Sequence, residues 1–414
     1  MGFTGFFGML VIMTSRWVRL QAVAVSGSSA EGLMLAALPL LAVSVTTDPR
    51  EISLLNIAGQ APWLLLSLFA GVLIDRVRRT AVLAWAYAVQ IGAAVALAVA
   101  ASAGVLSLPV LIVVAFVVTS AQVLGDGASG ALVPELVEPG RLAHANARLT
   151  VIDRGVVQFV VPPLTGFLLA VGAGVPAWLA AACALGALLL ARRIPSESRT
   201  VATTTHPLRD LSAGLRHLVK TPLLRSITIN VALGSFAASA GNAMFVLYAT
   251  QILHVGPVGY GLLLACLAVG WVASSFVVQK VVDRLGYSWS MRIAQSFGIV
   301  ADLLIAVVPP WPPLVGLVLM SLTASVLIWN VCSQSSRQRF TPAPLLGRVL
   351  TGHRALAWGL TPLGALTGGL VAAHWSLRGV WVVAAVIQAV SAVLVWFTLS
   401  PAAFRRTELA TAQA

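Results

Sequence analysis

Long apolar stretches recur along the chain and are separated by short polar connections. A helix that crosses a bilayer needs about 20 predominantly apolar residues, and each stretch meets that length within a few residues. The pattern predicts an all-α integral membrane protein with 12 transmembrane helices. The predicted helices cover residues 20–46, 52–74, 80–101, 108–132, 147–171, 174–191, 223–252, 258–281, 289–308, 312–335, 350–374 and 379–400.

One long polar stretch divides the predicted helices into two sets of six. We therefore expect an N-terminal extension, an N-terminal six-helix half, a cytoplasmic linker, a C-terminal six-helix half and a cytoplasmic tail. Their boundaries are 1–19, 20–191, 192–221, 222–400 and 401–414. The apolar start of the chain lacks the positive region and the cleavage site of a secretory signal, so we interpret it as an uncleaved extension.

The composition excludes a soluble domain. Hydrophobic residues make up 59% of the chain and charged residues only 9%, whereas soluble domains carry about 25% charged residues. The net charge of +13 has a topological explanation, because Lys and Arg stay in cytoplasmic loops. With the N-terminus inside, every basic residue except Arg50 and Arg378 falls at or beside an inner connection. We expect a bacterial inner-membrane protein with both termini cytoplasmic and no nucleic-acid partner.

The sequence carries no motif that indicates an enzyme. A Gly-x-x-x-x-Gly-Lys-Ser/Thr phosphate loop is absent, so the chain does not have the motif of an ATP-driven motor. No His or Cys spacing fits a metal site. The cysteines Cys183, Cys266 and Cys332 lie in apolar stretches, and we interpret them as packing residues. We predict no enzymatic activity, no cofactor and no metal.

Short motifs recur in the two predicted halves. Asp75-Arg76 follows the second helix, and Asp283-Arg284 follows the eighth. Gly140-Arg141 follows the fourth helix and recurs as Gly347-Arg348 after the tenth, at nearly the same offset. A duplicated six-helix layout places a substrate cavity between the halves near the bilayer midplane, and one half rocks against the other.

With these motifs the chain resembles the major facilitator superfamily. Residues 71–79 read GVLIDRVRR, which is similar to the family signature Gly-x-x-x-Asp-Arg/Lys-x-Gly-Arg-Arg/Lys with Arg78 in place of the second glycine. The phrase Ala37-Leu38-Pro39 is typical of a branch of bacterial drug and siderophore exporters, of the enterobactin-exporter and macrolide-efflux type. The resemblance implies the major facilitator fold and transport by alternating access. No arginine stands inside the fourth helix, where antiporters of the superfamily often carry one.

Charged residues around the signature are candidates for gating. A carboxylate at the inner end of the second helix, Asp75, is placed to cap a helix N-terminus in the other half, where the helix dipole favours negative charge. The neighbouring arginines are placed to pair with acids across the same seam. The alternative is that they only anchor topology. The predicted gating set is Gly71, Asp75, Arg76, Arg79, Asp283 and Arg284.

Acids inside the predicted helices are candidates for proton coupling, because ionisable residues within a membrane are rare and usually functional. Glu31 lies about twelve residues into the first helix, so roughly 18 Å deep. Asp126 lies in the small-residue stretch 125–130, and Asp302 lies near the middle of the ninth helix. Asp153 and Arg154 are adjacent on the fifth helix, so they face different directions. The predicted coupling set is Glu31, Asp126 and Asp302, and the alternative is a structural role inside the bundle.

Amide and aromatic side chains in the helices are candidates for a substrate cavity. Few charges and several aromatic faces suit a bulky amphipathic compound. The alternative for each residue is packing. The predicted cavity residues are Asn56, Gln60, Asn230, Asn242, Tyr248, Trp329, Asn330 and Trp358.

These observations together favour a secondary active transporter. We expect a monomer in the lipid bilayer that exports a hydrophobic or amphipathic organic compound (a drug, antibiotic or siderophore), with protons as the coupling ion. One alternative is an importer or symporter of a small metabolite. Another is a transport-inactive membrane receptor or assembly partner, against which the retained signature at residues 71–79 argues.

Overall fold

The computed structural model describes residues 3–138, 142–194, 215–342 and 345–412, with the side chains of residues 3–15 and a few others outside that description. Within these ranges every regular element is a helix. Eleven of the helical segments found there are long and apolar enough to cross a membrane. They match eleven of the twelve predicted spans, and the twelfth coincides with a further long helix, α2 (Pro49–Arg76). The predicted all-α membrane fold is confirmed.

The first six predicted spans correspond to helices whose ends differ from the prediction by a few residues, except at the start of the chain. There the first helix is continuous from Phe3, and its candidate span begins at Arg16 rather than at residue 20. The fifth span consists of three consecutive segments. In chain order the helices are α1 (Phe3–Val45), α2, α3 (Arg79–Ser102), α4 (Leu108–Leu136), α5 (Leu142–Arg154), η2 (Gly155–Val160), α6 (Val161–Val171) and α7 (Val175–Arg192).

The second six spans follow the same order, and most of the predicted linker between the two sets lies outside the described residues. The helices are α9 (Pro222–Leu247), η3 (Tyr248–Ile252), α10 (Pro257–Ser275), α11 (Val278–Val307), α12 (Pro312–Arg339), α13 (Leu346–Gly359), α14 (Thr361–His374), α15 (Leu377–Thr398) and α16 (Pro401–Ala412). The predicted tail 401–414 thus begins as a helix, which Arg339 on α12 contacts through an ion pair to Glu408 of 2.7 Å.

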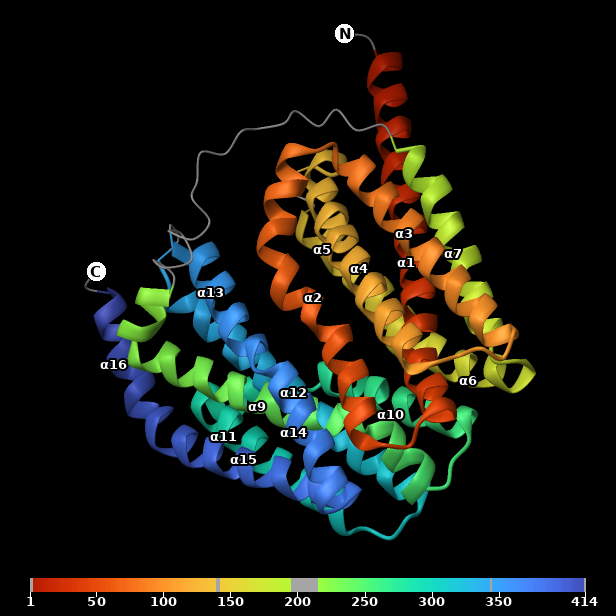
Figure 1. Cartoon of the computed structure of the whole chain (residues 1–414). Coiled ribbons are helices and arrows are strands. Elements are labelled where there is room, and N and C mark those ends of the chain that lie inside the picture. Colours follow the sequence, from red (N-terminus) through yellow and green to blue (C-terminus); the bar gives the residue numbers. More distant parts are fainter. Residues whose placement is uncertain (1–2, 139–141, 195–214, 343–344, 413–414) are drawn as a thin grey trace. The chain divides into compact units, whose positions relative to one another are not determined.

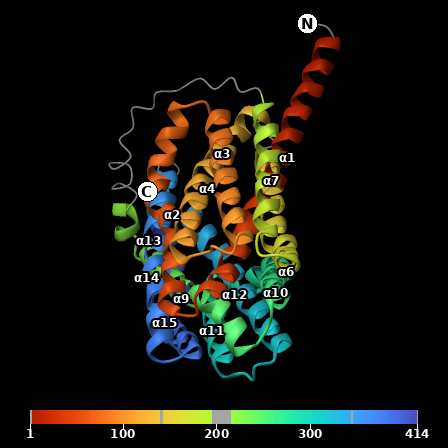
Figure 2. The ribbon, with the colours of Figure 1, turned by 45° about the vertical axis from the view of Figure 1, so that its right-hand side comes forward.

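The chain divides into two compact units. Unit 1 comprises residues 1–46, 58–204 and 256–265, and unit 2 comprises residues 47–57, 205–255 and 266–414. In unit 1, α1 and α3 both pack against α7, and α3 packs against α4 (Figures 1 and 2). In unit 2, α9 and α11 both pack against α15, and α11 packs against α12. The same pairing of first, third, fourth and sixth helices in each unit is the structural counterpart of the sequence repeat.

The fifth helix of each set is interrupted at a proline. Proline removes a backbone donor and clashes with the preceding turn. In the first set the π-helix η2 is followed directly by α6, which has Pro162 and Pro163 near its start. In the second set a single residue separates the end of α13 from the start of α14, and Pro362 is the second residue of α14. A π-helical segment inside a membrane helix often marks a functional site, and η2 directly follows Asp153 and Arg154.

A glycine bends α11 near its beginning. Gly286 has φ 71° and ψ 167°, a conformation outside the helical region that residues with a Cβ rarely adopt. The predicted eighth span, 258–281, ends earlier in the structure, at Ser275, where a turn at residues 276–277 separates α10 from α11. The chain turns at Gly286, and the straight part of α11 that crosses the unit starts just after it.

A buried basic cluster joins three helices of unit 2. Arg337 of α12 donates from Nη1 to Ser333 Oγ at 2.7 Å and contacts Nε2 of His353 at 2.6 Å. The other ring nitrogen of His353 lies 3.0 Å from Oγ1 of Thr228 on α9, and that hydroxyl donates to the Leu224 carbonyl. Because Nε2 accepts from the guanidinium, Nδ1 must carry the proton and donate to Thr228. The cluster fixes both the tautomer of His353 and the position of α13.

Candidate functional site

An acidic cavity of about 260 Å³ lies inside unit 1, among α1, α3, α4 and α5. Three carboxyl side chains line it, Glu31 from α1, Asp126 from α4 and Asp153 from α5. Two of them belong to the predicted coupling set, and the structure brings them together with a third acid. The cavity lining contains no Arg, Lys or His among the residues that the structure describes.

Helical periodicity places the polar side chains of each helix on the face toward this cavity. On α1 the lining residues are Ala24, Gly27, Ser28 and Glu31, on α4 they include Gln122 and Asp126, and on α5 they are Asn146, Leu149, Thr150 and Asp153. Residues three, four and seven apart lie on one face of a helix. Each of these three helices thus presents its polar lining residues to the cavity from one face.

Hydrogen bonds orient two of the three acids. The Gln122 amide on α4 donates to the Glu31 carboxylate on α1. Ser28 Oγ donates to Asp153 Oδ1 at 3.1 Å and so connects α1 with α5. Asp126 interacts electrostatically with Asp153. Neutral donors therefore connect the carboxylates of Glu31 and Asp153 to neighbouring helices.

Two polar side chains of α3 complete the cavity wall. Tyr87 and Gln90 are each 8% exposed, line the cavity and have no hydrogen-bond partner among the described residues. The Tyr87 ring packs over Gly27 so closely that a Cβ at that position would meet Cε1 at 2.9 Å. Buried polar groups are nearly always hydrogen-bonded, so these two leave capacity for a bound molecule or ion.

A second cavity, of about 310 Å³, lies inside unit 2, and its lining is more aromatic. α9, α11, α12 and α15 supply most of the wall. Five predicted cavity residues and one acid of the predicted coupling set lie in that wall, namely Asn230, Asn242, Trp329, Asn330, Trp358 and Asp302. The amides also connect helices, since Asn230 donates to Ser391 and Gln295 Nε2 donates to Gln388 Oε1 at 2.7 Å.

Asp302 and Trp381 are two deeply buried polar groups of this second cavity that have no partner among the described residues. Asp302 is 4% exposed, and the described residues give its carboxyl group no hydrogen bond and no ion pair. Trp381 is 5% exposed, and its Nε1 has no hydrogen-bond partner in the described part of the chain. The Trp381 ring fits because Gly241 of α9 lacks a side chain, and a Cβ there would lie 2.8 Å from the ring.

Three predicted cavity residues lie elsewhere. Tyr248 is fully buried, donates its hydroxyl to the Ile305 carbonyl at 2.9 Å and meets the edge of Trp381, so it supports the cavity wall from behind. Asn56 donates to the backbone carbonyl of Ile52 at 3.0 Å. Gln60 is half-buried and lines neither cavity.

The predicted gating residues have mixed surroundings. The surroundings of Gly71 and the side chain of Asp75 lie outside the description, and Arg76, Asp283 and Arg284 are exposed. Asp283 accepts a hydrogen bond from Gln279 at 2.8 Å. The gating role of these residues stays a prediction.

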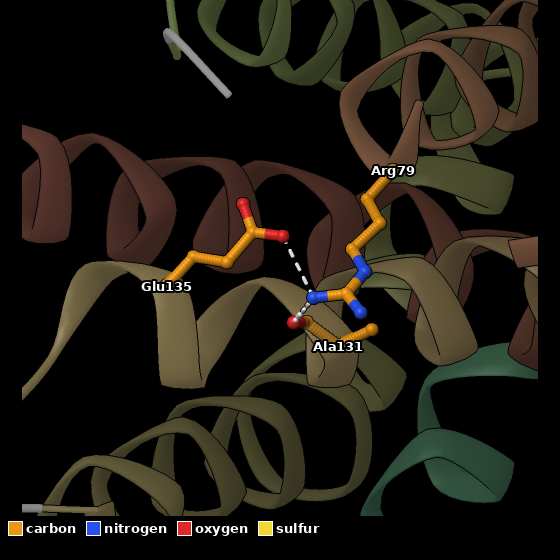
Figure 3. Close-up of polar contacts among 3 residues, drawn as sticks. All are labelled: Arg79, Ala131 and Glu135. Carbon is orange, nitrogen blue, oxygen red and sulfur yellow. Dashed lines mark hydrogen bonds and ion pairs between the residues drawn. The ribbon is translucent and has the colours of Figure 1, made fainter. Parts of the chain in front are cut away.

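Arg79 forms its ion pair inside unit 1. Its Nη1 donates to Glu135 Oε1 and to the Ala131 carbonyl, both at 2.7 Å (Figure 3). The two side chains are 27% and 24% exposed, and the pair connects the start of α3 with the end of α4.

Several cavity residues do not stand out in the sequence. Asp153 is an acid within a predicted helix but stands outside the predicted coupling set, and Tyr87, Gln122 and Trp381 belong to none of the predicted sets. The signal for Asp153 is its spacing from Asn146 and Thr150, which places all three on one face of α5. Trp381 carries no comparable signal, because only the packing of α15 against α9 brings its ring to the cavity.

Two helical units with matching internal packing, each holding a polar cavity among apolar helices, define a multi-pass membrane transporter. The family model described as transmembrane secretion effector matches residues 12–411. The chain therefore belongs to this family of major facilitator transporters, and it is not an enzyme.

Individual relatives agree with this assignment. The chain is 26% identical to an uncharacterized MFS-type transporter, y4rN, of Sinorhizobium fredii, over 86% of this chain and 88% of that protein. It is 28% identical to the enterobactin exporter EntS of Citrobacter koseri, over 55% of this chain and 54% of that one. A crystal structure of a bacterial homologue of the iron transporter ferroportin superposes with a TM-score of 0.75 at 17% identity, covering 94% of this chain and 99% of that chain. The last match shows the fold alone.

Proposed function

We propose that this transporter exports a hydrophobic or amphipathic organic compound by alternating access, driven by the inward flow of protons. The acidic cavity of unit 1 is the observation that carries the proposal. Three carboxyl groups from three helices share one cavity with no basic residue in its described lining. Like charges held together in a site of reduced polarity favour the uptake of a cation, and the proton is the simplest one.

The second cavity supports an organic substrate. Its wall combines tryptophan faces with a few amides and one acid, which is the usual composition of a site for a small organic molecule. The name of the EntS relative favours export of such a compound. In our proposal the protein is a monomer of the bacterial inner membrane with both termini cytoplasmic, because nearly all basic residues then lie on the inner side.

Efflux of the hydrophobic dye Nile red from preloaded, de-energised cells tests this function. Re-energised cells with the wild-type protein should lose dye faster than cells without it, and a protonophore should abolish the difference. Glu31→Gln should lower the energy-dependent rate by about tenfold or more, because an amide at this depth cannot exchange a proton. Glu138→Gln, which changes an exposed carboxyl group of the same unit, should export normally.

Two results would overturn the proposal. Wild-type efflux by Glu31→Gln, at equal amounts of protein in the membrane, would exclude coupling through this residue. No energy-dependent efflux by the wild type would exclude the export of hydrophobic compounds.

A further inference from the structure

We propose that the cavity of unit 2 recognises a positively charged organic group, an amine or a quaternary ammonium, through Asp302 and the surrounding tryptophans. The inference rests on the proposed function, because it takes this cavity as the substrate site. It adds the class of substrate, a lipophilic organic cation, and it gives Asp302 a role in substrate recognition.

The charge of the cavity is the first argument. Asp302 is the one ionisable side chain among the cavity residues in the described part of the chain. Its carboxyl group is 4% exposed and has neither a hydrogen bond nor a charged neighbour there. A buried carboxylate without a partner is costly. A ligand with a positive charge supplies the missing partner.

The aromatic wall is the second, independent argument. Trp329 of α12, Trp358 of α13 and Trp381 of α15 line the same cavity as Asp302. Tryptophan is the side chain whose ring face attracts a cation most strongly, and aromatic walls are the usual means of binding a quaternary ammonium group. Gly241 makes room for one of these rings at the wall. Carboxylate and ring faces together select for a cation with an apolar surface.

The arrangement of side chains along α11 aims the acid into the cavity. Gln295, Gly298 and Asp302 are three, four and seven residues apart, so they share one helix face, and all three line the cavity. Gln295 is held by its hydrogen bond to Gln388 of α15. Gly298 leaves space beside it, since the nearest side-chain atom to a Cβ there, Ser325 Oγ, lies 3.9 Å away. The volume of about 310 Å³ lies at the lower end of the range for small-molecule sites.

Equilibrium dialysis with the purified full-length protein in lipid nanodiscs tests the inference. The probes are benzyltrimethylammonium and its neutral carbon isostere neopentylbenzene, which have nearly the same shape and differ in charge. We expect the cation to bind the wild type about tenfold or more tighter than the isostere, after correction for partitioning of each probe into protein-free nanodiscs. The measurement needs no proton gradient, so its outcome does not depend on export or proton coupling.

Matched variants locate the binding. Asp302→Asn should weaken binding of the cation by about tenfold and leave binding of the neutral isostere within about twofold, which also shows that the cavity is intact. Glu138→Gln, which changes an exposed carboxyl group of unit 1, should bind both probes like the wild type. Equal affinity of the wild type for both probes would overturn the inference, as would unchanged binding of the cation by Asp302→Asn.

Discussion

The buried cluster around His353 predicts a measurable loss of stability when the imidazole is replaced. In His353→Leu the Arg337 guanidinium loses an acceptor at 2.6 Å, and the Thr228 hydroxyl loses a donor at 3.0 Å. A hydrogen bond to a charged group contributes about 1.5–3 kcal/mol and a neutral one about 0.5–1.5 kcal/mol. We therefore expect the free energy of unfolding to fall by about 3 kcal/mol.

The Arg337 guanidinium has little means of replacing the hydrogen bond that it loses in His353→Leu. Arg337 is 9% exposed, and its Nε already lacks a hydrogen-bond partner within the described ranges. Ser333 remains as its one side-chain acceptor among the described residues. A buried charge that loses a hydrogen bond keeps its full desolvation cost, so the estimate for His353→Leu lies in the upper part of the usual range for single substitutions.

Reversible unfolding in mixed detergent micelles, followed by tryptophan fluorescence, measures the change. Thr228→Val alone should cost about 1 kcal/mol, and the double variant with His353→Leu should cost less than the sum, because both changes remove the same hydrogen bond. His144→Leu, at an exposed histidine, should change the free energy of unfolding by less than about 0.5 kcal/mol. A loss below 0.5 kcal/mol for His353→Leu, or strict additivity with Thr228→Val, would refute the reasoning.

Three further predictions address other parts of the molecule. Gly241→Val should displace Trp381 and weaken binding of benzyltrimethylammonium by about tenfold. A thermal-unfolding scan of the same variant should show a destabilisation of about 1–3 kcal/mol, because the added side chain overpacks the site. Unchanged binding would contradict the role of the Trp381 ring. Arg79→Gln should cost less than about 1 kcal/mol, because its ion pair with Glu135 is partly exposed, and a larger loss in the same scan would show that the pair does more than join two helix ends. A cysteine introduced at Val105, in the connection after α3, should react with a membrane-impermeant thiol reagent only from outside the cell, and labelling from the cytoplasmic side alone would reverse the proposed orientation.

The membrane helices were predictable because lipid imposes its requirement locally. The apolar runs that correspond to α4 and α15 can be recognised as membrane helices without reference to the rest of the chain. The reason is that a residue facing hydrocarbon must be apolar whatever its neighbours are. The breaks within the spans were less predictable. Prolines 162 and 163 indicate an interruption, but the bend at Gly286 depends on a positive φ that the residue type permits and does not require.

The candidate site residues also include some that the sequence indicates and others that it does not. An acid in an apolar run is conspicuous, so Glu31, Asp126 and Asp302 were found from the sequence, and the amides and tryptophans of the second cavity were largely found with them. The position of Tyr248 was not predictable, because an aromatic residue with a hydroxyl packs against a carbonyl as readily as it faces a ligand.

The amino-acid sequence by itself determined which segments enter the membrane, that they repeat as two sets, and which acids lie at depth. The tertiary structure alone decided which of those acids share a cavity, that Asp153 joins Glu31 and Asp126, and that Asp302 lines a cavity with three tryptophans and no other acid among the described residues. The physical reason is that the two properties depend on different lengths of chain. Hydropathy acts on each residue separately and is readable along the chain, whereas the charge balance of a cavity depends on how helices far apart in the sequence rotate and pack.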